Sequence, residues 1–137
     1  MSGLLLDTHI LLWTSLEPAR LSKAAQEQIQ DATQLYVSAI TLYEVVYLAL
    51  DGRVQLALDP HLWFQTMAAR LDLVVLPVTA EIAGLAASLA RYPNGDPADR
   101  LIVSTAIHLN VSLCTADRNM RRYHKSKPAE IAFEVIW

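Results

Sequence analysis

The sequence contains little cysteine, little charge and no long hydrophobic run. Its 137 residues include one cysteine, Cys114, which excludes an internal disulfide and a zinc site built from cysteines. Every apolar run is short and interrupted by polar residues, so no segment is long enough for a transmembrane helix. The N-terminal MSGLLLDTHILLW has no basic region, and Asp7 divides its apolar run, which argues against a signal peptide. These absences predict a cytoplasmic protein that does not bind a membrane.

Phosphate-binding glycine loops, repeats and low-complexity segments are also absent. Neither GxGxxG nor GxxxxGK[ST] occurs, so nothing supports nucleotide binding on a glycine loop. The four histidines share no metal-ligand spacing, and we interpret them as packing or surface residues. The net charge of −3 carries no overall indication of nucleic-acid binding. No linker interrupts the chain, so we predict one domain over residues 1–137.

What the sequence does contain is a series of short apolar runs that alternate with helical patterns. Hydrophobic residues make up 53% of the chain, a proportion that predicts apolar surface covered by a partner. The expected strands are residues 4–6, 35–37, 73–76, 111–114 and 132–136. The expected helices are residues 8–16, 22–31, 38–50, 60–70, 79–91 and 97–110. Short continuous apolar strands between helices are typical of an α/β fold with a parallel sheet covered on both faces.

Acidic residues follow two of the expected strands at corresponding places. Asp7 follows the first strand and Asp117 the fourth. In such a sheet, ligands bind at the carboxyl ends of the strands, where the strand order reverses, so these two carboxylates are expected to face one crevice. Asp99 lies near the start of the helix that leads into the fourth strand, and simple topology predicts that this end lies away from the crevice. The alternative for all three, and for Asp96 as a helix N-cap, is a purely structural role.

Glu44 is the only charged residue in AITLYEVVYLAL, residues 39–50. A helix that is apolar on nearly all sides is buried or covered by a partner. A carboxylate there must be paired, protonated or bound to a metal, and a buried arginine such as Arg100 is the alternative partner. Several acids without a matching set of lysines are what a magnesium ion requires, and such an ion activates water against a phosphodiester. Without the ion, at least one acid should have a raised pKa.

Two other acidic α/β sites fit the sequence less well. A phosphatase of the haloacid-dehalogenase type would need a second aspartate two residues after Asp7, where His9 stands. A response-regulator receiver would need paired acids at the first strand and a lysine after a late strand, and neither is present.

A basic segment follows Asp117 directly. It contains Arg118, Arg121, Arg122, Lys125 and Lys127. We predict either a solvated surface turn or a group of cations that holds a phosphate chain beside the acidic site.

Four motifs, LLLDTHILLW, VSAITLYEV, GDPADRLIVSTA and LCTADRNM, occur in an order and spacing that resemble PIN-domain proteins, specifically VapC-type toxins of bacterial toxin–antitoxin pairs. The resemblance covers essentially the whole chain, and the four motifs together are specific although each alone is weak. It implies a Rossmann-like fold, a parallel central sheet flanked by helices, and an endoribonuclease that depends on Mg²⁺ or Mn²⁺.

The resemblance also implies roles for particular residues. By motif, the acidic quartet is Asp7, Glu44, Asp99 and Asp117. Its implied metal ligands are Asp7, Asp99 and Asp117, with Asp96 and Thr115 as supporting residues. It further implies that the helix start at Asp99 lies at the crevice after all.

Three partners are implied in the same way: an RNA substrate, a second copy of the chain in a homodimer, and a small antitoxin that covers an apolar groove. Candidate groove residues are Trp13, Leu42, Val46, Trp63 and Phe64, and the alternative for each is an ordinary place in the core. The alternative function is a non-catalytic binding module that keeps the acids for structure or for a partner. The sequence does not identify the RNA or the antitoxin.

Overall fold

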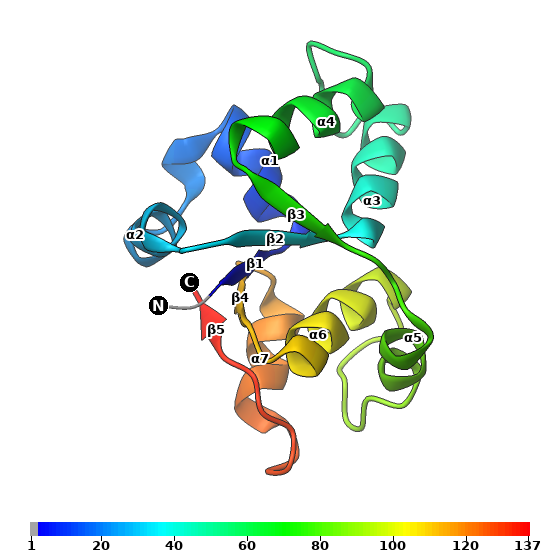
Figure 1. Ribbon diagram of the computed structural model, residues 1–137. Coiled ribbons are helices and arrows are strands. Elements are labelled where there is room, and N and C mark those ends of the chain that lie inside the picture. Colours follow the sequence, from blue (N-terminus) through cyan, green and yellow to red (C-terminus); the bar gives the residue numbers. More distant parts are fainter. Residues whose placement is uncertain (1–2) are drawn as a thin grey trace.

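The protein folds around one parallel sheet, as a computed structural model that describes residues 3–137 shows (Figure 1). The sheet has five strands in the order β3-β2-β1-β4-β5, and every neighbouring pair is parallel. The strands are β1 (Leu4–Leu6), β2 (Leu35–Ser38), β3 (Leu73–Leu76), β4 (Ser112–Cys114) and β5 (Val135–Ile136). The predicted fold class is therefore confirmed.

Helices cover both faces of this sheet. They are α1 (Thr8–Leu16), the 3₁₀ turn η1 (Pro18–Arg20), α2 (Lys23–Asp31), α3 (Ala39–Leu50), α4 (Pro60–Arg70), α5 (Ala80–Ala87), α6 (Pro97–Leu109) and α7 (Arg118–Ser126). In Figure 1, α1, α3 and α4 lie above the sheet, α2 lies at its left end, and α5 to α7 lie below it. Among the described residues, no helix is both long enough and apolar enough to cross a membrane.

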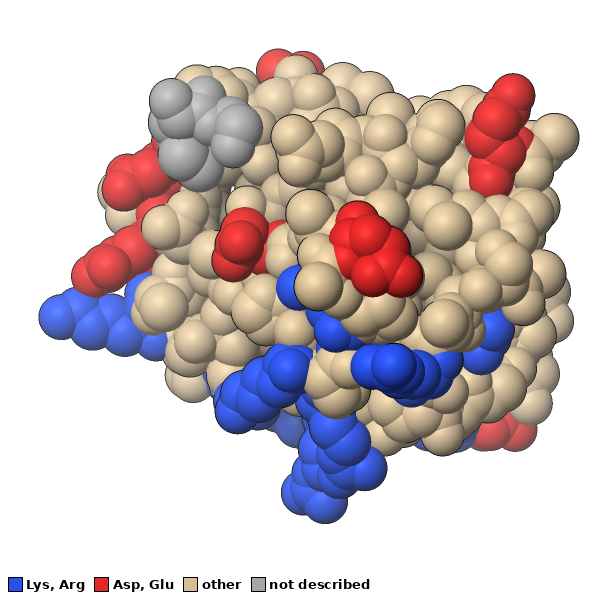
Figure 2. Space-filling model, turned by 90° about the horizontal axis from the view of Figure 1, so that it is seen from below, with Lys and Arg blue, Asp and Glu red and all other residues tan. Residues whose placement is uncertain are grey.

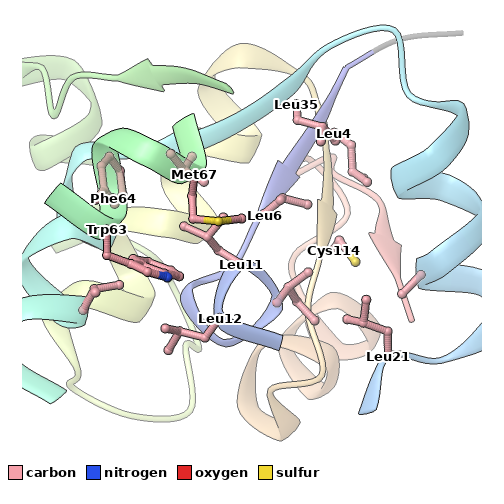
Figure 3. Close-up of a cluster of buried hydrophobic side chains, with 14 of the residues drawn as sticks. Leu4, Leu6, Leu11, Leu12, Leu21, Leu35, Trp63, Phe64, Met67 and Cys114 are labelled. Atoms are coloured by element: carbon pink, nitrogen blue, oxygen red, sulfur yellow. The ribbon is translucent and has the colours of Figure 1, made fainter. Parts of the chain in front are cut away.

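The central strand β1 supplies side chains to two hydrophobic cores, one on each face. Leu4 and Leu6 pack in the core that α1 and α4 cover, whereas Leu5 packs in the core that α6 and α7 cover. All three leucines are fully buried. Figure 3 shows Leu6 beside Leu11 and Met67 in the first of these cores. Because successive strand residues face opposite sides, a continuous apolar run is what a strand buried on both faces needs.

The strand order reverses between β1 and β4. From β1 the chain moves outward to β2 and β3, then returns to pair β4 on the other side of β1. The two strands end in register, since Leu6 is opposite Cys114 and the backbone N–H of Asp7 donates to the carbonyl of Cys114 at 3.0 Å. The segments that follow β1 and β4 therefore leave the sheet side by side.

Three expected elements differ from the observed ones. The helix expected over residues 79–91 ends at Ala87, because the Ser88 hydroxyl and the Arg100 guanidinium satisfy the carbonyls of its last turn. The expected strand 132–136 is reduced to Val135–Ile136. The basic segment after Asp117, one alternative for which was a surface turn, forms the helix α7, with Met120 and Tyr123 buried beneath it.

Candidate active site

A cleft of about 620 Å³ opens where the strand order reverses. Five carboxylates line it, and they come from the segment after β1, from α3, from the start of α6 and from the segment after β4. They are Asp7, Glu44, Asp96, Asp99 and Asp117. The structure thus brings the whole acidic quartet together with Asp96. Among the described residues, the one lysine or arginine that lines the cleft is Arg53.

Asp7 is held rigidly at the centre of this group. Its side chain is 6% exposed, and both carboxylate oxygens accept a hydrogen bond. Oδ1 accepts from the backbone N–H of Thr8 at 2.7 Å, which makes Asp7 the N-cap of α1. Oδ2 accepts from the hydroxyl of Thr115 at 2.7 Å. Burial raises the pKa of Asp7 to about 7, and the charges of Glu44 and Asp117 add to this, although the two hydrogen bonds oppose it.

Thr115 connects Asp7 to Asp117. While its hydroxyl donates to Asp7, the same oxygen accepts from the backbone N–H of Asp117 at 2.9 Å. The Asp117 side chain in turn accepts from the backbone N–H of Met120 at 2.9 Å and caps α7. A single buried hydroxyl therefore fixes the spacing of two carboxylates that leave neighbouring strands.

Glu44 is anchored by a threonine and not by an arginine. The hydroxyl of Thr8 donates to Glu44 Oε1 and also lies 3.2 Å from the hydroxyl of Thr41. Burial raises the pKa of Glu44, and the charges of Asp96 and Asp117 add to the effect. The alternative pairing with Arg100 is wrong, because that guanidinium donates to the backbone carbonyls of residues 86, 87, 89 and 94.

Asp99 lines the cleft from the first turn of α6, whose N-cap is Asp96. The topological expectation that this end lies away from the crevice was wrong. Since α6 ends immediately before β4 begins, the helix runs back across the sheet, so its start lies at the edge where the strands end. Burial raises the pKa of Asp99 to about 8, and the charges of Asp117 and Asp96 contribute.

Three helices begin at the cleft, and each uses one of its carboxylates as N-cap. Asp7 caps α1, Asp96 caps α6 and Asp117 caps α7. The amino end of a helix carries partial positive charge from its unpaired N–H groups. These three helix ends therefore offset part of the repulsion among the acids.

The donor chemistry of the cleft fits a hard divalent cation held largely through water. Within residues 3–137, no three histidine, cysteine, aspartate or glutamate side chains lie close enough together to enclose a metal ion as they stand. Magnesium, however, is commonly bound by one or two carboxylates and keeps several waters. Burial is the main cause of the raised pKa values of Asp7 and Asp99, and the neighbouring carboxylates add a repulsion that such a cation would relieve. The ligand roles of Asp7, Asp99 and Asp117 stay a prediction.

The basic residues of α7 form a cluster of their own beside the acidic cleft. Arg118, Arg121, Arg122 and Lys125 line a separate depression of about 270 Å³, and Lys127 is the C-cap of the helix. Figure 2 shows the molecule of Figure 1 from below, and Lys and Arg side chains gather over the lower part of this view. Asp117, the N-cap of α7, links this depression to the cleft in sequence. Contact of the cluster with RNA stays a prediction.

The five candidate antitoxin-groove residues differ in exposure. Trp63 and Phe64 are each 5% exposed and lie inside a core, as Figure 3 shows. Trp13 and Leu42 are half-buried at the margin of the same core, and Val46 is half-buried on α3. Antitoxin docking at these positions stays a prediction, and little of the two α4 side chains is available for it.

Among the other residues that line the cleft are four with polar or aromatic side chains that sequence reasoning did not assign to the site: His9, Tyr43, Tyr47 and Arg53. Two of them could have been found from the sequence. Tyr43 is adjacent to Glu44, and Tyr47 lies three positions after Glu44, on the same side of the helix. Burial and the charge of Arg53 lower the pKa of His9. The place of Arg53 at the cleft could not be predicted from its neighbours in sequence, because this residue lies beyond the end of α3.

The chain belongs to the PIN domain family, whose sequence model matches residues 4–126. It is also similar to Ribonuclease VapC22 of Mycobacterium tuberculosis, with 40% identity over 131 residues that cover 96% of this chain and 99% of that protein. The family resemblance of the four sequence motifs is therefore confirmed.

Solved structures of toxin–antitoxin proteins share the fold. VapBC2 from Rickettsia felis, solved with a promoter DNA fragment, matches with a TM-score of 0.66 and 18% identity over 98% of both chains. DNA-bound VapBC from Salmonella typhimurium matches with a TM-score of 0.64 and 24% identity over 98% of both chains. VapBC-5 from Mycobacterium tuberculosis matches with a TM-score of 0.63 and 16% identity over 98% of each chain. At these identities the likeness concerns the fold.

Proposed function

We propose that this protein is a metal-dependent endoribonuclease, the toxin of a VapBC-type toxin–antitoxin pair, and that it uses Mg²⁺ or Mn²⁺. The observation that carries the proposal is the convergence of five carboxylates in one cleft, which a single arginine lines within residues 3–137. The identity with Ribonuclease VapC22 supports the choice of RNA as substrate. Because the activity requires access to cellular RNA, we propose a cytoplasmic location.

In this proposal the carboxylates divide into ligands and a proton acceptor. Asp7, Asp99 and Asp117 would hold the cation, which when bound supplies Lewis-acid chemistry at the phosphate. Glu44 has one oxygen held by Thr8, which leaves the other oxygen to orient the attacking water and accept its proton. Burial raises its pKa, which makes the ionised carboxylate a stronger base than an exposed one.

The threonines act as positioning residues. Thr115 holds Oδ2 of Asp7, and the backbone N–H of Thr8 holds Oδ1, so the carboxylate cannot rotate. A ligand held in one orientation loses little conformational entropy when the cation and the substrate bind. The three helix N-termini at the cleft also offer partial positive charge to a bound phosphate.

The test is RNA cleavage by purified protein with magnesium, with manganese and with EDTA. We expect Asp7→Asn and Asp99→Asn each to abolish cleavage while the fold is retained, because an amide is a much weaker ligand for a hard cation. Asp31→Asn is the matched control, since Asp31 is an exposed aspartate at the end of α2. Cleavage at the wild-type rate by either site variant would refute the metal assignment.

The partners belong to the same proposal. The fold likeness to proteins of VapBC complexes supports a cognate antitoxin, and the 53% hydrophobic content supports a surface that a partner covers. We further propose a homodimer and an RNA path over the basic cluster of α7. A non-catalytic binding module is the alternative, and metal-dependent cleavage by the wild type would exclude it.

A further inference from the structure

Two tyrosines at the mouth of the cleft are largely exposed to solvent. The side chains of Tyr43 and Tyr47 are 65% and 54% exposed, and both line the cleft that contains the carboxylates. Their rings are nearly parallel, with an interplanar angle of 8° and a distance of 6.5 Å between centroids. Because neither ring is buried, packing of the fold does not explain why aromatic residues stand at these positions.

The position of the pair on α3 connects it to the chemistry. Glu44 follows Tyr43 directly and precedes Tyr47 by three positions, and all three side chains line the same cleft. The two rings are therefore part of the wall of the cleft next to Glu44. The rings adjoin the site and do not form a separate surface.

A cation lies at the same entrance. Arg53 follows the end of α3 and lines both the main cleft and a smaller cavity of about 160 Å³, which His9 also lines. Within the described chain, Arg53 forms no ion pair with a carboxylate. Its guanidinium is thus available to a phosphate on the tyrosine side of the cleft.

We infer that Tyr43 and Tyr47 form a platform on which unpaired bases of single-stranded RNA stack, while Arg53 binds a phosphate of the same strand. The inference rests on the proposed function and assigns the residues that bind its RNA substrate. Aromatic side chains stack on every kind of base, whereas the bases of a duplex are already stacked on each other and expose no face. The occupant is RNA and not the antitoxin, because the rings open into the cleft where the scissile phosphate must lie.

The test is the affinity for a labelled single-stranded oligoribonucleotide, measured by fluorescence anisotropy in the non-cleaving Asp99→Asn background. We expect Tyr43→Ala and Tyr47→Ala each to weaken binding by roughly 5- to 150-fold, the range that loss of one stacked base gives. Tyr→Phe at either position keeps the ring and should retain the affinity within about twofold. Leu50→Ala is the control, since Leu50 is 81% exposed on the same helix and does not line the cleft.

An abasic oligonucleotide separates stacking from other contacts. It has the same phosphates but no bases, so the tyrosine variants should bind it as well as the Asp99→Asn protein with both tyrosines does. Arg53→Ala should weaken both oligonucleotides and reduce the slope of log K against log[salt] by roughly 0.7, the value for one phosphate contact on a single strand. The tyrosine variants should leave that slope unchanged.

Two outcomes would overturn the inference. One is an unchanged single-strand affinity in both tyrosine variants. The other is an equal loss on the abasic oligonucleotide, and if antitoxin affinity falls at the same time, the tyrosines belong to the antitoxin surface. Failure of the proposed function is distinguishable, because it would appear as absence of metal-dependent cleavage by the wild-type protein, whatever the binding data show.

Discussion

Neutralising Asp7 should stabilise the protein when no metal is present. Asp7 is 6% exposed, and burial with the charges of Glu44 and Asp117 raises its pKa to about 7. An ionised carboxylate at this place therefore destabilises the folded state. Asp7→Asn removes the charge with almost no change in shape, and Asn is also a good N-cap for α1.

The magnitude follows from the difference in pKa. The ordinary value of 3.8 rises to about 7 in the folded protein. At about 1.36 kcal/mol for each pKa unit, ionised Asp7 lowers the free energy of unfolding by about 4 kcal/mol at alkaline pH. The Asn side chain recovers only part of this free energy, because the Thr115 hydroxyl loses a charged acceptor, which costs about 1.5–3 kcal/mol. The net stabilisation of the variant is then about 1–3 kcal/mol.

The stability difference between Asp7→Asn and the wild type depends on pH. A folded-state pKa above the unfolded one means that the protonated carboxyl stabilises the fold, and that this stability is lost as pH rises from about 4 through 7. Asp7→Asn cannot show this loss. Its Tm should exceed that of the wild type by about 3–12 °C at pH 8.5 in EDTA, and the difference should shrink toward zero, or reverse, at pH 5.

The assay is thermal unfolding by circular dichroism between pH 5 and pH 9. Asp31→Asn controls for the removal of an exposed negative charge outside the cleft. A Tm difference between Asp7→Asn and wild type that is the same at pH 5 and pH 8.5 would refute the account of Asp7 as a buried acid with a raised pKa.

Three other perturbations address the cation, the basic cluster and the positioning residues. Magnesium at ten to a hundred times its Kd should stabilise the wild type by about 1–3 kcal/mol, and the effect should vanish in an Asp7→Asn, Asp99→Asn double variant in the same melting assay. Replacing Arg121 and Arg122 with Ala should reduce the salt slope of RNA binding by roughly 1.4 and leave the magnesium effect intact; an unchanged slope would assign the cluster to another role. Thr115→Val should lower the free energy of unfolding by about 1–3 kcal/mol in urea, whereas Thr115→Ser should stay near the wild type.

The elements that local patterns specify were predictable from the sequence. Asp96-Pro97 predicts a helix start, and the Asp96 side chain does accept from the backbone N–H of Ala98 at 2.9 Å. The run Leu4–Leu6 predicts a buried strand, and all three leucines are fully buried. In both cases the determining interactions lie within a few residues, or depend only on apolar content.

The elements that distant contacts decide were not predictable. The early end of α5 depends on Arg100, whose side chain reaches back to the carbonyls of Ala86 and Ala87. The helix α7 has few apolar residues, so its buried face, with Met120 and Tyr123, gave only a weak periodic signal. Which side of the uniformly apolar α3 faces solvent also depends on tertiary packing, and for that reason the exposure of Tyr43 and Tyr47 was not foreseen.

A structural role as helix N-cap and the proposed role in the active site do not exclude each other for these acids. Asp7, Asp96 and Asp117 are N-caps, and the same three carboxylates line the cavity. Replacing such a residue with Ala removes the cap, which costs about 0.5–2 kcal/mol, together with the charge. Replacing it with Asn keeps the cap and removes only the charge. A loss of activity in an Ala variant therefore says little about chemistry, whereas the same loss in an Asn variant whose stability is equal or greater isolates the role of the negative charge.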